Sequence, residues 1–318
     1  MKARAVFALA LLVSASAGAQ GYPARPLRMI VPFPAGGGSD AVARIIGEKL
    51  GDRFGQQVVI DNRAGKGGSV GTEGAVKATP DGYNMVLAST SEIAINPALY
   101  KLSYDTLKDL TPVALVASTA IVVLVAPSSG LESIKDLLAL AKTKPGGIHV
   151  ASAGTGTITH LSGELFRTLA GVNWKHVPYK GAPLALTDLA VGRVHVMFSS
   201  LPAAMPLIRT GRLKPIAVSS RNRQPSLPDL PTVMESGLPG YDVEYWYGVF
   251  VPLATPRSSI ARLANEIEYS LRQKDVITHL ANQGALPGKS NQAQFAQFVH
   301  AEHGRWTKLV KSSGAKAD

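Results

Sequence analysis

Twice along this chain, a short apolar segment with the character of a β-strand runs straight into a glycine-rich loop. The first segment is 27–31, followed by the loop 33–40, and the second is 148–151, followed by the loop 152–157. After each loop, apolar residues recur at helical spacing. Strand, loop and helix in this order form βαβ units, so the sequence predicts an α/β fold with parallel strands.

The position of the two loops predicts a ligand site as well as a fold. The first turn of a helix leaves backbone N–H groups unpaired, and the helix dipole adds positive potential there, so an anion is attracted. Because the loops lie about 120 residues apart in the printed sequence, we expect two lobes that face one cleft. The candidate ligand-binding residues in the loops are Phe33, Ala35, Gly36, Gly37, Ser39, Asp40, Thr155, Gly156 and Thr157.

Three further side chains are candidates because of their place in the predicted elements. Thr90 and Ser199 lie near the carboxyl ends of predicted strands, where short hydroxyls can bind a carboxylate, although serine and threonine are also common in loops. His160 lies about one turn into the helix after the second loop, and either contacts a ligand or packs and caps the helix. We predict Ser39 as the N-cap of the first helix.

The rest of the chain continues the alternation of strands and helices. The long apolar run 113–126 is either two strands or one strand that crosses between lobes. The proline-rich segment 222–240 should be a surface connection, and 245–251 a strand that returns to the first lobe. Two amphipathic helices are expected at about 260–273 and 292–311.

The first 19 residues have the pattern of a secretory signal. Lys2 and Arg4 precede a short apolar stretch, and Ala17-Gly18-Ala19 is a small-residue cleavage site, so we expect export to the periplasm with cleavage after Ala19. The apolar stretch is too short to span a bilayer, and an uncleaved anchor is the alternative.

Composition and motifs exclude several function classes. The chain has no cysteine, which excludes thiol catalysis and cysteine-based metal sites, and its net charge of +11 is spread along the sequence, which favours attraction of anionic solutes, or solubility alone, over nucleic-acid binding. The loops lack the spacing of nucleotide motifs, and no metal ligand or cofactor motif is found. Gly67-Gly68-Ser69-Val70-Gly71 matches G-x-S-x-G, but a polar loop precedes Ser69 where a nucleophile elbow needs a strand.

Motifs along the whole predicted mature chain resemble one family, the tripartite tricarboxylate transporter substrate-binding proteins, also called Bug proteins. The matching stretches are 22–28, 30–40, 62–68, 80–83, 154–161, 177–181, 227–237 and 246–248. The sequence departs from the family pattern at His195, where we expect an acidic residue, and at Ser199 and Ser200, where Asp or Asn is frequent. We place these departures near the cleft edge of the second lobe, where they bear on the identity of the ligand.

The resemblance implies a two-lobed periplasmic binding protein fold, type II-like, with two Rossmann-like domains joined by crossing hinge strands. We expect a signal peptide over 1–19, a first lobe over 20–121 and 242–318, and a second lobe over 122–241.

The resemblance also implies a function without catalysis or cofactor: capture of a small carboxylate, either an organic acid or an amino acid. The partners implied are the membrane subunits of a tripartite tricarboxylate-type transporter, with the binding protein itself a monomer that does not bind nucleic acid. Two alternatives are an exported serine hydrolase that uses Ser69 and a ligand sensor that signals to a membrane protein.

Overall fold

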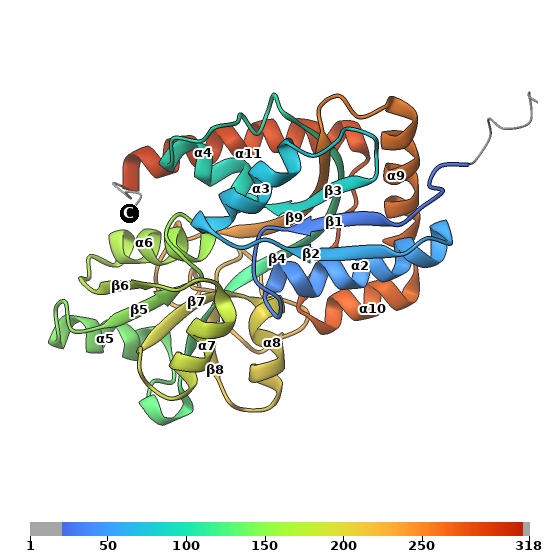
Figure 1. Cartoon of the computed structure of the whole chain (residues 1–318). Helices are drawn as coiled ribbons and strands as arrows, with labels where there is room; N and C mark the ends of the chain where they lie inside the picture. The colour runs from blue at the N-terminus through green and yellow to red at the C-terminus, as the bar shows by residue number, and fades with distance from the viewer. Residues whose placement is uncertain (1–20, 314–318) are drawn as a thin grey trace, which may run out of the picture.

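The computed structural model describes residues 21–313, which form an α/β fold (Figure 1). The predicted signal segment and its cleavage site lie outside the described residues. The strands are β1 (Leu27–Val31), β2 (Val58–Asn62), β3 (Asn84–Ser89), β4 (Leu110–Val125), β5 (His149–Ser152), β6 (Lys175–Pro178), β7 (Val196–Ser200), β8 (Lys214–Val218), β9 (Glu244–Pro252) and β10 (Ala285–Pro287). The helices are α2 (Gly38–Phe54), α3 (Ser69–Val76), α4 (Asn96–Leu99), α5 (Ile134–Thr143), α6 (Ile158–Ala170), α7 (Ala182–Ala190), α8 (Leu201–Arg209), α9 (Arg257–Ser270), α10 (Lys274–Asn282) and α11 (Gln292–Ser313), with short turns η2 (Lys66–Gly68), η3 (Ser91–Ile95) and η4 (Pro127–Ser129).

The described strands follow the order β2-β1-β3-β9-β4-β7-β5-β6, with β8 and β10 also paired to β4. The strand pairs β1–β2, β1–β3, β5–β6 and β5–β7 are parallel, as the βαβ pattern predicts. β1, β2, β3, β9 and β10 belong to a first lobe and β5 to β8 to a second, which lies below the first in Figure 1.

The long apolar run is one strand, β4, that serves both lobes. It pairs with β9 as far as Ala120, opposite Glu244, and with β7 from Ile121, opposite Ser200. The return crossing lies just before β9, where the Val243 amide donates to the Ser219 carbonyl of the second lobe. Residues 120–125 are fully buried, and from Val122 on the strand lies between β7 and β8 of the second lobe.

In the first lobe, helices cover both faces of the sheet. In Figure 1, α2, α9 and α10 lie on one face, while α3, α4 and α11 lie on the other. Met29 belongs to the apolar cluster that includes Ile46 of α2, whereas its neighbour Ile30 packs in the cluster of Phe250 and Phe295. This alternation is the period of two that a strand imposes on its side chains.

The helix α2 begins two residues before the position expected from its predicted N-cap. Its N-cap is Gly37 rather than Ser39, and no side chain caps it. Asp40 accepts the Gly36 amide instead (2.9 Å), so a carboxylate within the first turn holds the loop that a serine cap was predicted to hold. The helix continues through Gly51 to Gly55, whose φ of 61° suits the left-handed C-terminal position.

The two predicted C-terminal helices correspond to α9 and α11, but the segment between them holds two elements that we did not predict. These are α10 and the short strand β10, which pairs with β4 (Ala285 opposite Thr119). The turn η3 and helix α4 were also not predicted. No helix among the described residues 21–313 is long and apolar enough to cross a membrane.

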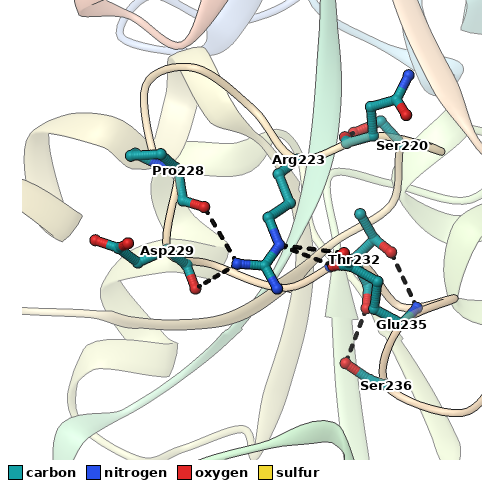
Figure 2. A network of polar contacts seen from close by, with 8 residues as sticks. Ser220, Arg223, Pro228, Asp229, Thr232, Glu235 and Ser236 are labelled. Atoms are coloured by element: carbon teal, nitrogen blue, oxygen red, sulfur yellow. Dashed lines mark hydrogen bonds and ion pairs between the residues drawn. The ribbon is translucent and has the colours of Figure 1, made fainter.

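The proline-rich segment after β8 is an ordered surface connection, shown in Figure 2. Arg223 Nε donates to the Glu235 carboxylate (3.0 and 3.2 Å), and its Nη1 donates to the Pro228 carbonyl (3.3 Å). Thr232 and Glu235 form a reciprocal capping pair, with the Glu235 amide donating to Thr232 Oγ1 and the Thr232 amide to the Glu235 carboxylate. Polar contacts therefore order a segment that prolines keep out of regular secondary structure.

Candidate functional site

Two adjoining hollows lie between the lobes. The smaller, which we call the inner pocket, has a volume of about 30 Å³, and the larger, the outer cleft, has a volume of about 490 Å³. The inner pocket is lined by Phe33, Pro34, Gly37, Gly38, Ser39, Ala153, Thr157, Ile158, Thr159, Ala182, Ser200 and Tyr245. The outer cleft is lined by Phe33, Pro34, residues 64–68, Tyr100, residues 153–155 and residues 178–181.

Four helices begin at the inner pocket. Gly38 is the first residue of α2, Ile158 of α6 and Ala182 of α7, while Ser200 is the N-cap of α8. None of the described residues that line either hollow is acidic. The positive ends of four helix dipoles therefore meet in a space that holds no carboxylate of the protein.

The starts of α2 and α6 were selected from the sequence as ligand-binding segments, whereas those of α7 and α8 were not. Gly181-Ala182-Pro183 and Ser200-Leu201-Pro202 place a proline in the first turn of α7 and α8, which is a recognised signal for the start of a helix. That signal was available in the sequence, but neither segment carries a run of glycines.

The lobes touch directly across the site. Tyr100 Oη of the first lobe donates to the Thr155 carbonyl of the second (2.7 Å), and the Ile158 amide donates to Ser91 Oγ (3.0 Å). A Cβ on Gly67 would lie 2.9 Å from the Thr155 carbonyl oxygen. These contacts describe a closed arrangement, in which the first lobe already pairs one N-terminal amide of α6.

Asp40 stabilises the first loop from within. Its carboxylate accepts hydrogen bonds from the Gly36 amide, Arg44 Nε (2.9 Å) and Asn62 Nδ2 (3.1 Å). Burial alone would raise the pKa of Asp40, but these hydrogen bonds outweigh it and hold the pKa below its ordinary value. The ionised carboxylate of Asp40 thus stabilises the first glycine-rich loop.

The predicted site residues fall into two groups. Phe33, Gly37, Ser39 and Thr157 line the inner pocket, and Phe33 and Thr155 line the outer cleft. The remaining candidates line neither hollow: Ala35, Gly36, Asp40, Thr90, Gly156, His160 and Ser199. Their roles toward a ligand stay predictions.

Several of the second group have protein partners. Thr90 Oγ1 accepts the Trp246 amide (3.2 Å), and Ser199 Oγ donates to the Ser200 carbonyl (3.4 Å). His160 stacks on His176 with ring centres 4.0 Å apart, and its Nδ1 accepts the Gly156 amide (3.3 Å). His160 therefore stabilises the second loop through its hydrogen bond with the Gly156 amide.

Residues that the sequence analysis did not select also line the site. Tyr245 reaches the inner pocket from β9, and Lys66, Tyr100 and Lys180 line the outer cleft. Lys66 has a positive φ of 44°, which is uncommon outside glycine and is enriched at functional sites.

The departure at His195 lies elsewhere than expected. His195 precedes β7 at its amino end, where its Nδ1 accepts the His149 amide (3.1 Å), whereas the pocket lies at the carboxyl end of β7, by Ser200. Ser200 lines the inner pocket, whereas His195 and Ser199 line neither hollow.

Ser69 has the surroundings of a structural residue. It is the first residue of α3 and is 6% exposed. Its Oγ accepts a hydrogen bond from Asn96 Nδ2 (3.1 Å), an amide that cannot take a proton from it. This partner gives Ser69 no activation as a nucleophile.

Comparison with known proteins finds a matching family model and similar proteins. The family model of the tripartite tricarboxylate transporter family receptor, TctC, matches residues 42–315. Protein BugT of Bordetella pertussis is 37% identical over 306 residues, which cover 96% of this chain and 94% of BugT.

Solved structures agree with the sequence match. The periplasmic binding protein BugD is 32% identical, with a TM-score of 0.89 over 93% of this chain and 99% of BugD. Rpa4515 of R. palustris, solved with adipate, is 35% identical, with a TM-score of 0.91 over 93% of this chain and 99% of Rpa4515. MatC of Rhodopseudomonas palustris, solved with malate, is 32% identical, with a TM-score of 0.86 over 91% of this chain and 100% of MatC. These relatives are binding proteins rather than enzymes, and their structures share the two-lobed fold.

Proposed function

We propose that this chain, which belongs to the tripartite tricarboxylate transporter receptor family, is an exported binding protein that holds a small carboxylate between its lobes. It would deliver the acid to the membrane subunits of a tripartite tricarboxylate-type transporter, acting as a monomer.

The observation that carries the proposal is the convergence of four helix N-termini on the inner pocket. A carboxylate there would be stabilised by backbone N–H groups and helix dipoles, and it would meet no acidic side chain of the described lining. The pocket volume of about 30 Å³ is close to the share of one water in the liquid, so it suits the carboxylate group alone. The outer cleft would take the rest of the acid.

Two relatives support the class of ligand, since Rpa4515 was solved with adipate and MatC with malate. Export is supported by the signal pattern in the sequence and by the periplasmic relative BugD. The lobe bounds 20–121 with 242–318, and 122–241, stay predictions. The exchange of β4 partners after Ala120 supports them.

The test is a thermal-shift screen of small monocarboxylates, dicarboxylates and amino acids, followed by calorimetry on the hits. An acid that binds only the folded state should raise the melting temperature, and at 100 times its Kd it should add about 2.7 kcal/mol of stability. The uncharged amides of the same acids are the control and should produce no shift. If no acid raises the melting temperature, the proposed function is wrong.

A pair of variants tests whether the acid binds in the inner pocket. Ser200→Ala removes a hydroxyl from the pocket lining and should weaken binding of any hit by about fivefold, the value of one hydrogen bond. Ser236→Ala removes a hydroxyl in the surface connection of Figure 2 and should leave the affinity unchanged.

A further inference from the structure

A buried carboxyl group, Glu92, lies behind the pocket and takes no part in the binding proposed above. Glu92 is fully buried in the turn η3. Its Oε2 accepts the Ser89 amide (2.9 Å) and lies 2.5 Å from Ser89 Oγ. Its Oε1 is buried with no hydrogen-bond partner among the described residues, and it packs against Gly68, where a Cβ would lie 2.8 Å away.

A chain of hydroxyl groups links Glu92 to the inner pocket. Tyr245 Oη lies 3.0 Å from Ser89 Oγ, and Tyr245 lines the pocket. The Ser91 amide also donates to Ser89 Oγ (3.3 Å), so this oxygen already accepts one hydrogen bond. Burial first, and the nearby charge of Glu92 second, raise the pKa of Tyr245 far above its ordinary value, so Tyr245 remains a hydroxyl.

The protonation state of Glu92 fixes the direction of this chain. An ionised carboxylate only accepts, so Ser89 must donate to Glu92, and Tyr245 then donates to Ser89. Tyr245 in that state offers the pocket only lone pairs, which repel a carboxylate. A neutral Glu92 can donate through Oε2 to Ser89, Ser89 then donates to Tyr245, and the Tyr245 proton is available to the pocket.

We propose that Glu92 is a positioning residue for the bound acid: in its neutral form it makes the Tyr245 hydroxyl a donor to a carboxylate in the inner pocket. The proposal rests on the proposed function and deepens it, because binding of the acid becomes linked to the proton on Glu92. An acid that binds while Glu92 is ionised would bring one proton from solvent onto Glu92.

The surroundings of Glu92 bring its pKa into the range where both the neutral and the ionised form are populated near neutral pH. Burial raises its pKa to about 7, against the opposing effect of hydrogen bonds from Ser89 and the backbone. The tyrosines Tyr104, Tyr245 and Tyr247 lie within reach of its charge, and burial raises the pKa of each above its ordinary value.

Among the other elements packed against η3, the ionisable groups lie on η2 and α11. The turn η2 contributes Lys66 and Gly68, and the described part of α11 carries His300, Glu302, His303, Arg305, Lys308 and Lys311. Of these, Glu302 accepts from the indole N–H groups of Trp246 and Trp306 and pairs with Arg305. The strand β3 and helix α4 contribute no acidic or basic side chain.

Infrared spectroscopy of the ligand-free protein tests the proton on Glu92 directly. The wild type should show the C=O stretch of a protonated carboxyl group that disappears as the pH rises through about 7. The band should be absent in Glu92→Gln and shifted in frequency in Ser89→Ala, because the hydrogen bond to Ser89 is lost. Glu73→Gln, which replaces a half-buried carboxyl of α3 that pairs with Lys77, is the control and should leave the band unchanged. A wild type without such a band, or a band that persists in Glu92→Gln, overturns the proposal.

Calorimetry with adipate as the probe tests the link to binding. In the wild type, adipate affinity should fall by about tenfold for each pH unit above the pKa of Glu92, as expected when one proton is taken up on binding. Glu92→Gln, which is always neutral, should bind adipate with the wild-type affinity measured in mild acid and show no fall at higher pH. Tyr245→Phe should bind weakly and without this pH dependence.

The outcomes separate the two proposals. Retention of the pH dependence in Glu92→Gln or in Tyr245→Phe overturns the role of Glu92 while leaving carboxylate binding intact. If the wild type binds no acid at any pH, the proposed function fails, and the positioning role fails with it, whatever the infrared band shows.

Discussion

At the scale of single residues, Gly38 shows why a loop of glycines is needed where the lobes meet. A Cβ at this position would collide with Ser200 Oγ of the second lobe and lie 2.8 Å from Tyr247 Oη. Gly38 is the first residue of α2 and does not need a positive φ. Close approach of Ser200 from the second lobe and of Tyr247 from β9, rather than backbone conformation, therefore requires glycine here.

We predict that Gly38→Ala weakens ligand binding by about tenfold or more. The overpacked contact with Ser200 destabilises the closed form by about 1–3 kcal/mol, and this contact is absent when the lobes open. The clash with Tyr247 of β9 persists when the lobes open, so the melting temperature of the ligand-free protein should fall as well. Calorimetry and thermal unfolding measure the two effects. Gly51→Ala, in the same helix with its Cβ in ordinary contact, should leave affinity unchanged. Equal affinities for Gly38→Ala and wild type would contradict the closed geometry.

Asp40 gives a prediction for the dependence of stability on pH. Its pKa is lower in the folded protein, so its ionised form stabilises the fold above the unfolded pKa of about 3.9, and this stability is lost as the pH falls through the folded pKa. Asp40→Asn should therefore cost about 2 kcal/mol at neutral pH and progressively less in acid. Urea unfolding at several pH values measures the difference. Asp52→Asn, exposed near the end of α2, is the control, and an Asp40→Asn cost that did not shrink in acid would count against this reading.

The sequence led to part of the site at this scale. Phe33, Gly37, Ser39 and Thr157 could be selected because they lie in glycine-rich loops before helices, and all four line the inner pocket. Tyr245 could not be selected, since it belongs to a strand about 200 residues further along and reaches the pocket only through the pairing of β9 with β3 and β4.

At the scale of elements, the contact between the segment after α4 and the loop before α6 connects the lobes. Tyr100 Oη donates to the Thr155 carbonyl, and the Tyr100 ring lies against Gly156. Since the hydrogen bond exists only when the lobes approach, it favours the closed form over the open form.

We predict that Tyr100→Phe shifts the ligand-free protein toward the open form by about 1 kcal/mol and lowers apparent affinity by about fivefold. Small-angle X-ray scattering and calorimetry report the two changes. Tyr104→Phe, which removes a hydroxyl that donates to the Ser69 carbonyl within the first lobe, is the matched control. If the two variants lost affinity equally, the contact across the lobes would not be the cause.

Elements were predicted best where a periodic pattern was long or punctuated by glycine and proline. The β1, α2, α6 and α11 segments agree with their patterns. The single strand β4 could not be told from two strands, because an apolar run of β-branched residues has the same pattern in either case. Its continuity depends on β9 and β7, which come later in the chain and supply its partners.

At the scale of the whole molecule, the two lobes share a core. One apolar cluster includes Met29 and Ile46 of the first lobe, Val150 and Phe166 of the second, and Val123 of β4 between them. Lobes that share a strand and a core are not independent folding units.

We predict that residues of both lobes unfold together in one cooperative transition, with a calorimetric enthalpy equal to the van't Hoff enthalpy. Differential scanning calorimetry on the reversibly unfolding protein measures both. A saturating acid should move this single transition upward without splitting it. Two resolved transitions would show that the shared strand does not couple the lobes.

The sequence by itself determined the α/β class, the parallel strands, the two glycine-rich helix starts and the resemblance to the family, because each of these depends on local periodicity and short motifs. Only the tertiary structure decided which surfaces meet. It brought the starts of α7 and α8 to the same pocket as α2 and α6, and placed Glu92 behind Tyr245 through Ser89. These arrangements depend on contacts between segments far apart in the chain, which local pattern does not specify.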